Sequence, residues 1–199
     1  MKKISLAKIF TPVIALLSLA LVGCGSGANN DEGVSFTMFG FYANIEGSTG
    51  LTGSGMSLTE ATGADFFSPR AFIGLQNNLA GQFIRLNRVN YSYNIPGAAA
   101  QPPNTSAALP GVIGPAAGAT SPSNTTLPQG IGANDKIGPV GFFEIALVPK
   151  DTRDWMRANR GFLPAAPFQL EVSVSSSGRT SSGDFLESNE DTILVVVSD

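Results

Sequence analysis

The chain has 199 residues and a formal net charge of −3, and it contains no histidine and one cysteine. Without histidine there is no Ser-His-Asp or Cys-His catalysis, no common zinc site and no c-type haem attachment. An acidic chain without a basic stripe also argues against nucleic-acid binding. We therefore expect a protein that is not an enzyme and holds no cofactor.

The first 23 residues have the pattern of a cleaved export signal. Lys2, Lys3 and Lys8 supply a basic start, and no charged residue occurs from Ile9 to Val22. This apolar run is shorter than the ~20 residues that a permanent transmembrane helix needs. It ends in Leu21-Val22-Gly23-Cys24, which resembles the lipobox of bacterial lipoproteins.

The resemblance implies cleavage between Gly23 and Cys24 and a covalent lipid on the Cys24 thiol, the only prosthetic group expected. An ordinary secretory signal followed by a chance cysteine is the alternative. Two or more acyl chains hold a protein stably on a membrane, so the membrane would be the first partner. In Gram-negative members of the family, a residue other than Asp after the cysteine implies the outer membrane, and here it is Gly25.

The remainder is expected to form one domain behind a tether. Residues 24–33 are polar and Gly-rich, which predicts a flexible connection, and residues 34–199 have the length of one domain. Three of the 12 basic residues and none of the 15 acidic ones lie in residues 1–23, so the cleaved chain carries a net charge of −6.

Apolar residues at every second position predict most of the strands. In Phe168–Val174 one face is apolar and the other is polar, as in an antiparallel sheet with one wet face. The apolar phase changes inside Ile84–Tyr93, which predicts a β-bulge near Asn87-Arg88. Thr192–Ser198 is apolar in both phases and predicts a terminal strand covered on both faces. Further strands are expected at Val34–Tyr42, Arg70–Leu75 and Phe143–Leu147.

One helix, one hairpin and two loops are expected between these strands. Asp151–Asn159 has helical spacing, with Asp151 as the expected N-cap and Trp155 and Met156 packed under the sheet. Gly178 and Gly183 predict turns in a hairpin between Val174 and Thr192. Residues 47–63 and the Pro/Ala/Gly-rich insertion 96–133 are expected to be loops, because neither can bury much apolar surface.

This order of elements predicts an all-β antiparallel β-sandwich with one short helix and a long loop. The strand Val89–Tyr93 before a Pro-rich excursion, and the closing hairpin from Leu170 to Val197, resemble small immunoglobulin-like domains of secreted bacterial proteins. The resemblance implies an immunoglobulin-like sandwich. A small barrel is the alternative.

Two groups of carboxylates are candidate sites. Glu144 and Glu171 lie on expected strands and could form a pair of the kind that glycosidases use, or could be outward-facing solubilising residues. Four acidic residues near the closing hairpin could bind Ca²⁺, although their spacing matches no EF-hand loop. They are Asp184, Glu187, Glu190 and Asp191.

Cationic, aromatic and amide residues give three further candidates. Arg153, Arg157 and Arg160 recur at helical spacing and are expected to face solvent and pair with Asp151 and Asp154, or to meet an anionic partner. Asn104 and Asn124 match a glycosylation acceptor pattern, which we interpret as loop polarity in a bacterial chain. Four aromatic residues near the start of the domain could form a sugar-binding platform or belong to the core. They are Phe36, Phe39, Phe41 and Tyr42.

These expectations combine into one hypothesis and two alternatives. The first is a lipoprotein of the cell envelope whose sandwich binds or scaffolds an envelope protein or glycan without catalysis, with the 96–133 loop as a contact element. The second is a carbohydrate- or calcium-binding surface module. The third is a hydrolase that works through carboxylates.

Overall fold

The computed structural model of the 199-residue chain describes residues 35–44, 49–58, 68–116 and 139–199. All of them belong to one compact unit, Glu32–Asp199. The expected signal peptide (1–23), tether (24–33), Gly23 and Cys24 lie outside the described residues, as does Asn124. Within the described ranges, no helix combines the length and the apolar character that a membrane span requires.

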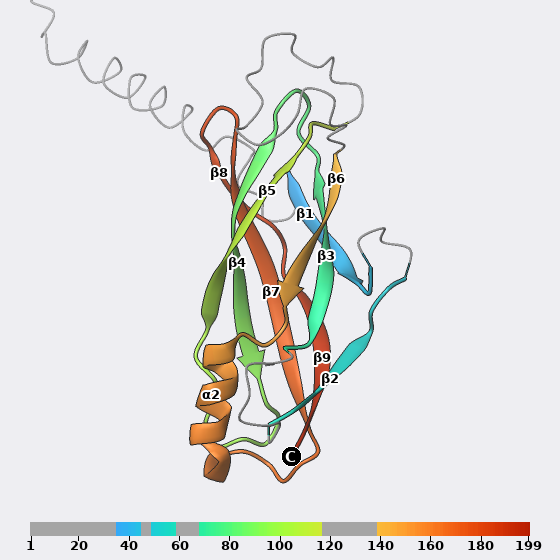
Figure 1. Cartoon of the computed structure of the whole chain (residues 1–199). Coiled ribbons are helices and arrows are strands. Elements are labelled where there is room, and N and C mark those ends of the chain that lie inside the picture. The colour runs from blue at the N-terminus through green and yellow to red at the C-terminus, as the bar shows by residue number, and fades with distance from the viewer. Residues whose placement is uncertain (1–34, 45–48, 59–67, 117–138) are drawn as a thin grey trace, which may run out of the picture. The chain divides into compact units, whose positions relative to one another are not determined.

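The described residues form two β-sheets packed face to face, with one short α-helix, so the expected all-β sandwich is confirmed (Figure 1). The small sheet has the order β1 (Phe36–Tyr42), β3 (Arg70–Asn77), β6 (Val140–Ala146). The large sheet has the order β2 (Gly53–Ser57), β9 (Asp191–Ser198), β7 (Phe168–Thr180), β4 (Ile84–Asn94), β5 (Thr105–Ile113), and β8 (Phe185–Glu187) also pairs with β7.

Alternation along the strands sends one apolar row from each sheet into a shared core. Ile73 and Leu75 of the small sheet and Leu170 and Val172 of the large sheet are all fully buried. Residues between them on each strand point to the outer face, the face turned away from the other sheet. The sequence periodicity of Phe168–Val174 therefore predicted the inner and outer sides of this part of β7 correctly.

The expected β-bulge in β4 is confirmed. The pairing of β4 with both β5 and β7 shifts register between Leu86 and Arg88. Ile84 and Leu86 are buried before the shift and Val89 is buried after it, so the change of apolar phase in the sequence marks the bulge. The bulge keeps the apolar side chains of both halves of the strand in the core.

Two expectations about the closing hairpin are wrong. β7 continues to Thr180, so Gly178 lies inside a strand, and only Gly183, with φ of 98°, lies in the turn. β9 is covered on one face only, because Leu194 and Val196 are 39% and 48% exposed while Ile193 and Val195 are buried. Leu194 and Val196, on the outer side of β9, are therefore partly in contact with solvent.

Both expected loops contain a strand. β2, within residues 47–63, runs parallel to β9, from Gly53 beside Leu194 to Ser57 beside Ser198. β5, within residues 96–133, pairs with β4 along its length, so the loop expectation is wrong for residues 105–113. Residues 117–133 lie outside the described part of the chain. β2 has one apolar side chain, Met56, whereas β5 also buries Leu109 and Ile113. Backbone pairing to a neighbouring strand holds both strands.

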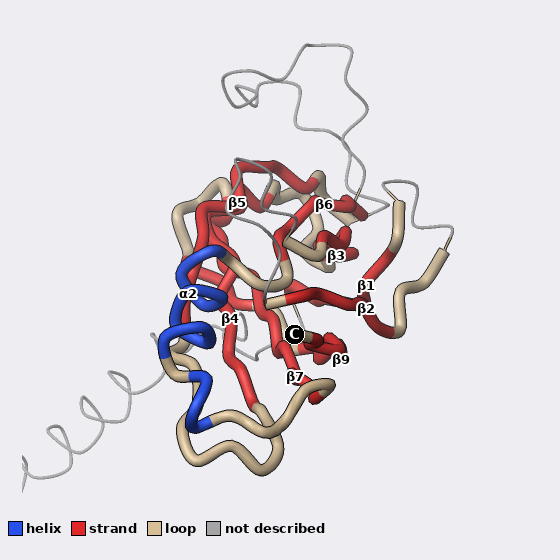
Figure 2. Tube along the Cα trace, turned by 60° about the horizontal axis from the view of Figure 1, so that its bottom comes forward, coloured by secondary structure: helices blue, strands red, loops and turns tan. Residues whose placement is uncertain are grey.

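The helix α2 (Lys150–Ala158) and the short 3-10 helix η1 (Arg160–Phe162) connect the two sheets, and α2 lies beside β4 (Figures 1 and 2). Met156 is fully buried and Trp155 packs against the core, as expected. The helix begins one residue before the expected N-cap: Pro149 takes that position, and no side chain caps it.

Two stacked tyrosines line the interior near this helix. The rings of Tyr91 and Tyr93 lie 6.2 Å apart between centroids and are nearly parallel. Burial raises the pKa of Tyr91 well above its ordinary value, and the neighbouring Tyr93 raises it further. Burial also raises the pKa of Tyr93, and the hydrogen bond between its hydroxyl and Thr105 opposes this shift. Both rings therefore stay uncharged in the folded chain at neutral pH.

Candidate functional site

Three aromatic side chains gather on the outer face of the small sheet. Phe39, Tyr42 and Phe142 form edge-to-face contacts, with ring centroids 5.1 to 5.8 Å apart. Edge-to-face geometry places the positive edge of one ring against the negative face of the next. We call this group the aromatic patch. It draws on both edge strands, β1 and β6.

Gly74 in the central strand makes the aromatic patch possible. A Cβ atom added at Gly74 would lie 2.5 Å from Cε2 of Phe39 and 2.9 Å from Cε2 of Tyr42, so the rings occupy the space that a side chain would fill. A register irregularity in β1 between Met38 and Gly40 places Phe39 and Tyr42, which are three residues apart, on the same outer face. The aromatic patch therefore rests directly on the backbone of β3.

Polar side chains border the aromatic patch along the same face. Arg70 forms an ion pair with Glu144 at 3.0 Å, one strand apart. At the other end, Gln76 donates to Asn78 at 2.8 Å, and Asn78 donates to Thr37 at 3.0 Å. Phe39 is 37% exposed at the centre of this border. An apolar centre inside a polar rim is the arrangement of a protein interface.

The four aromatic residues singled out in the sequence divide between the core and this surface. Phe36 and Phe41 are 1% and 5% exposed and belong to the core, whereas Phe39 and Tyr42 belong to the aromatic patch. The sequence did not indicate Phe142. Its contact with Phe39 and Tyr42 depends on the pairing of β6 with β3, which a single sequence does not give.

A polar pocket of about 370 Å³ lies on the large sheet, over β4, β5 and β7. Ser92 donates to Glu190 at 2.8 Å, and Asn90 donates to Glu187, next to the pocket, at 3.0 Å. The carboxylates are therefore oriented by neutral donors and keep further lone pairs for a ligand. The lining residues are Asn90, Tyr91, Ser92, Asn104, Thr105, Ser106, Ser175 and Glu190.

The acidic residues of the closing hairpin do not converge on one point. Among the described residues, no group of three or more acidic or cysteine side chains is arranged to hold a metal ion. Asp184 accepts hydrogen bonds from Ser182 and Thr180 in the β7–β8 turn. Asp191 accepts one from the backbone of Thr192. The calcium hypothesis for Asp184, Glu187, Glu190 and Asp191 therefore receives no support from their positions.

Glu144 and Glu171 do not form a catalytic pair. Glu144 is on β6 of the small sheet and pairs with Arg70, whereas Glu171 is on β7 of the large sheet and accepts from Asn94 at 2.6 Å. The outer faces of the two sheets point in opposite directions. The structure brings these two carboxylates to different surfaces.

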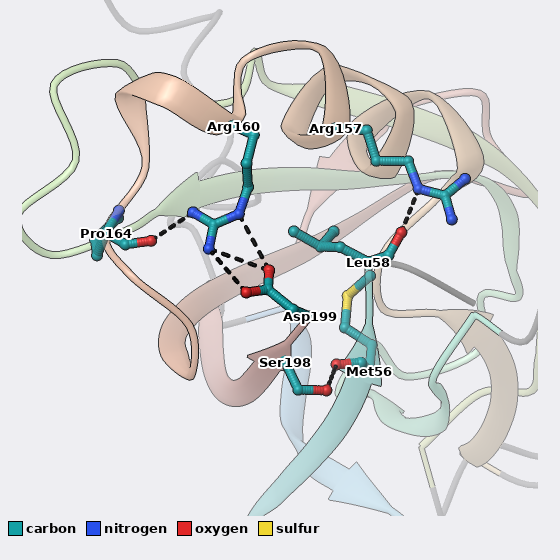
Figure 3. A network of polar contacts seen from close by, with 7 residues as sticks. All are labelled: Met56, Leu58, Arg157, Arg160, Pro164, Ser198 and Asp199. Carbon is teal, nitrogen blue, oxygen red and sulfur yellow. Dashed lines mark hydrogen bonds and ion pairs between the residues drawn. The ribbon is translucent and has the colours of Figure 1, made fainter.

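The helical arginines do not form the expected row of solvent-facing residues. Arg153 is buried, with 6% exposed. Arg157 donates through Nε to the carbonyl of Leu58, and Arg160 donates to both carboxylate oxygens of Asp199, the closest at 3.1 Å (Figure 3). Along the helix, Asp154 forms an ion pair with Lys150, which the sequence analysis did not name. Arg157 thus holds Leu58, which follows β2, against α2. Arg160 holds Asp199, which follows β9, against η1.

Comparisons of the chain with protein-family models, with curated proteins and with solved structures found no match. The candidate sites therefore depend on the geometry alone: the aromatic patch on the small sheet and the polar pocket on the large one.

Proposed function

We propose that the chain is a lipid-anchored lipoprotein of the bacterial cell envelope and that it acts as a tethered binding module without catalytic activity. The sequence Leu21-Val22-Gly23-Cys24 supports the anchor, and Gly25 supports the outer membrane of a Gram-negative bacterium. A domain tethered near one membrane meets other envelope components at high effective concentration. Binding is the function that such an anchor favours.

The aromatic patch is the observation that carries the binding proposal. Burial of aromatic rings is strongly favourable, yet these three rings lie outside the core, and Phe39 is 37% exposed. Aromatic residues are enriched where protein partners bind, and exposed apolar groups within a polar rim mark interaction sites. The partner we propose is therefore another envelope protein, which docks on the outer face of the small sheet.

Site-specific photo-crosslinking in the native envelope tests this surface. A crosslinking amino acid at Phe39 should give a discrete adduct, while the same group at Phe162, which is 56% exposed on η1, should not. Phe142→Ala should reduce the Phe39 adduct because it removes one ring of the aromatic patch. Equal adducts from both positions would reject the small sheet as the recognition surface.

The anchor has its own test. Mass spectrometry of the N-terminal peptide should find residue 24 as the first residue, carrying acyl groups. The protein should stay with membranes in high salt and leave them only with detergent, and Cys24→Ser should remove the lipid mass. An unmodified thiol at Cys24 in the membrane-bound protein would reject the lipoprotein assignment.

The polar pocket favours a second candidate function, carbohydrate binding. Hydroxyl, amide and carboxylate groups such as Ser92, Asn104 and Glu190 can both donate to and accept from sugar hydroxyls. A glycan array probed with wild type and with Glu190→Gln tests this candidate. Binding of the wild type to particular glycans that is lost in Glu190→Gln would support carbohydrate binding. Binding of the wild type to none of the glycans would contradict it.

We also infer that the sandwich is immunoglobulin-like. The closing β7–β9 hairpin and the β4 strand with its aromatic residues support this, since they are the segments that carried the sequence resemblance. An experimental structure compared with immunoglobulin-like domains tests the strand order.

A further inference from the structure

Three arginines share one surface at the end of the large sheet where β4 begins. Arg85 and Arg88 are on β4 and Arg179 is on β7, and all three are exposed. Residues three apart on a regular strand face opposite sides, but the bulge between Leu86 and Arg88 puts Arg85 and Arg88 on the same outer face. Only nine basic residues follow position 23, and three of them lie here.

Arg85 and Arg179 face each other directly across the β4–β7 pair. Side chains in such positions have Cβ atoms ~5 Å apart, and like charges there are destabilising. No ion pair between described residues involves Arg85, Arg88 or Arg179. The nearby carboxylates bind neutral donors instead: Glu187 accepts from Asn90 and Ser175, and Asp184 accepts from Ser182 and Thr180.

An exposed aromatic ring adjoins these arginines. Phe185 pairs with Arg179 in the β7–β8 register and is 51% exposed. An apolar ring beside guanidinium groups matches a membrane surface, where anionic headgroups lie above acyl chains. A free phosphate ion would use the arginines but gain nothing from Phe185.

The described chain also begins at this end of the sandwich. The carbonyl of Ser35 accepts from the backbone of Asn78, and the side chain of Asn77 donates to Gln82, just before β4. A chain can span at most ~3.6 Å per residue, so Ser35 lies within ~40 Å of Cys24. Ser35 and the three arginines therefore lie at the same end of the unit. Cys24 is joined to Ser35 by a short length of chain.

We propose that Arg85, Arg88, Arg179 and Phe185 form a docking surface for anionic phospholipid headgroups of the membrane that holds Cys24. This proposal rests on the lipid anchor proposed above. The guanidinium groups bind lipid phosphates, and Phe185 enters the boundary between headgroups and acyl chains. Docking orients the sandwich on the membrane and leaves the small sheet on the opposite side available to a partner.

The test uses the mature lipidated protein in neutral detergent micelles, titrated with phosphatidylglycerol. Side-chain NMR signals of the arginines should shift as phosphatidylglycerol is added and should reach a plateau. The apparent affinity for the lipid should fall as the salt concentration rises. Arg85→Gln with Arg179→Gln should weaken binding by about fivefold for each arginine removed. The matched control for the loss of one charge, Lys150→Gln, removes a charge from an exposed position elsewhere and should leave the affinity within about twofold.

Two comparisons separate the lipid from other anions. Phosphatidylcholine should cause no saturable shift, and Phe185→Ala should weaken phosphatidylglycerol binding but leave binding of inorganic phosphate unchanged. Equal shifts with both lipids, an equal loss in the control variant, or a lipid affinity that does not depend on Phe185 would overturn the proposal. The mass of the Cys24 peptide from the same preparation decides the anchor separately, so a failed anchor is distinguishable from a failed docking surface.

Discussion

The side-chain amide of Asn189 makes two hydrogen bonds with the backbone of Met38. The Met38 N–H donates to Oδ1 at 2.9 Å, and Nδ2 donates to the Met38 carbonyl at 2.9 Å. Asn189 lies between β8 and β9 of the large sheet, whereas Met38 is on β1, the edge strand of the small sheet. One side chain thus acts as a strand partner for β1 and joins the two sheets.

Asn189→Ala should lower the free energy of unfolding by about 1–3 kcal/mol, because it leaves a donor and an acceptor of Met38 without their partners in a partly buried place. Urea denaturation measures the change. Asn94→Ala is the control, since Asn94 is exposed and makes its hydrogen bond to Glu171 at the surface. Equal losses in the two variants would show that Asn189 has no special role in joining the sheets.

Gly178→Ala should destabilise the fold by about 1–3 kcal/mol. A Cβ atom there would lie 2.7 Å from the backbone carbonyl oxygen of Arg85, and a backbone atom in the middle of the large sheet has no room to move. Gly161→Ala provides the control, because nothing lies within 4 Å of a Cβ atom at that position. Thermal unfolding of both variants checks the difference, and similar melting temperatures would contradict the close approach of β7 and β4.

Arg160→Ala should cost more stability than Asp199→Asn. The Arg160–Asp199 ion pair is partly exposed, so its loss alone is expected to cost less than about 1 kcal/mol. Arg160 also donates to the carbonyl of Pro164 at 2.6 Å (Figure 3). It lies over the ring of Phe168 as well, and Asp199→Asn leaves both contacts in place. Chemical denaturation of the two variants ranks them. The reverse order would mean that the ion pair dominates this network.

Alkaline pH should unfold the protein through Tyr91 and Tyr93. Both have a folded-state pKa above the ordinary value of 10.0, so the folded state keeps their protons when the unfolded chain releases them. The contribution of the two tyrosines to the free energy of unfolding is fully present below about pH 10. It decreases as pH rises further, by up to ~1.4 kcal/mol per pH unit for each ring.

Tyrosinate absorbance and circular dichroism, followed in one titration, check this dependence. The absorbance of these two rings should rise together with unfolding, and Tyr91→Phe should make the fall in stability above pH 10 less steep. A full rise in tyrosinate absorbance from both rings while the fold is intact would contradict their burial.

The sequence predicted those parts of the fold that depend on local periodicity. Phe168–Val174 alternates regularly and forms the first half of β7, and the phase change near Asn87 marks the bulge in β4. β2 was missed because Gly53–Ser57 buries only Met56 among its apolar residues, and its partner β9 is far away in the chain. Pairing between distant strands leaves no periodic signal in either strand.

The two candidate surfaces could not be predicted from the sequence for the same reason, because they depend on pairing between strands. The aromatic patch depends on the absence of a side chain at Gly74 and on Phe142 two strands from Phe39, and the docking surface depends on Arg179 facing Arg85. Each relationship follows from register between strands. The sequence indicated Phe39 and Tyr42 as aromatic candidates but not the residues that complete the group.

The two hydrogen bonds between Asn189 and Met38 also bear on how the domain withstands mechanical force. The chain enters the sandwich through Ser35 and continues at once into β1. A pull on the proposed tether along the strand axis would load the β1–β3 hydrogen bonds in shear, all at the same time, and would not open them one by one. Asn189 would share that load with the large sheet, so tension on the proposed anchor would be distributed over both sheets and would not peel an edge strand away.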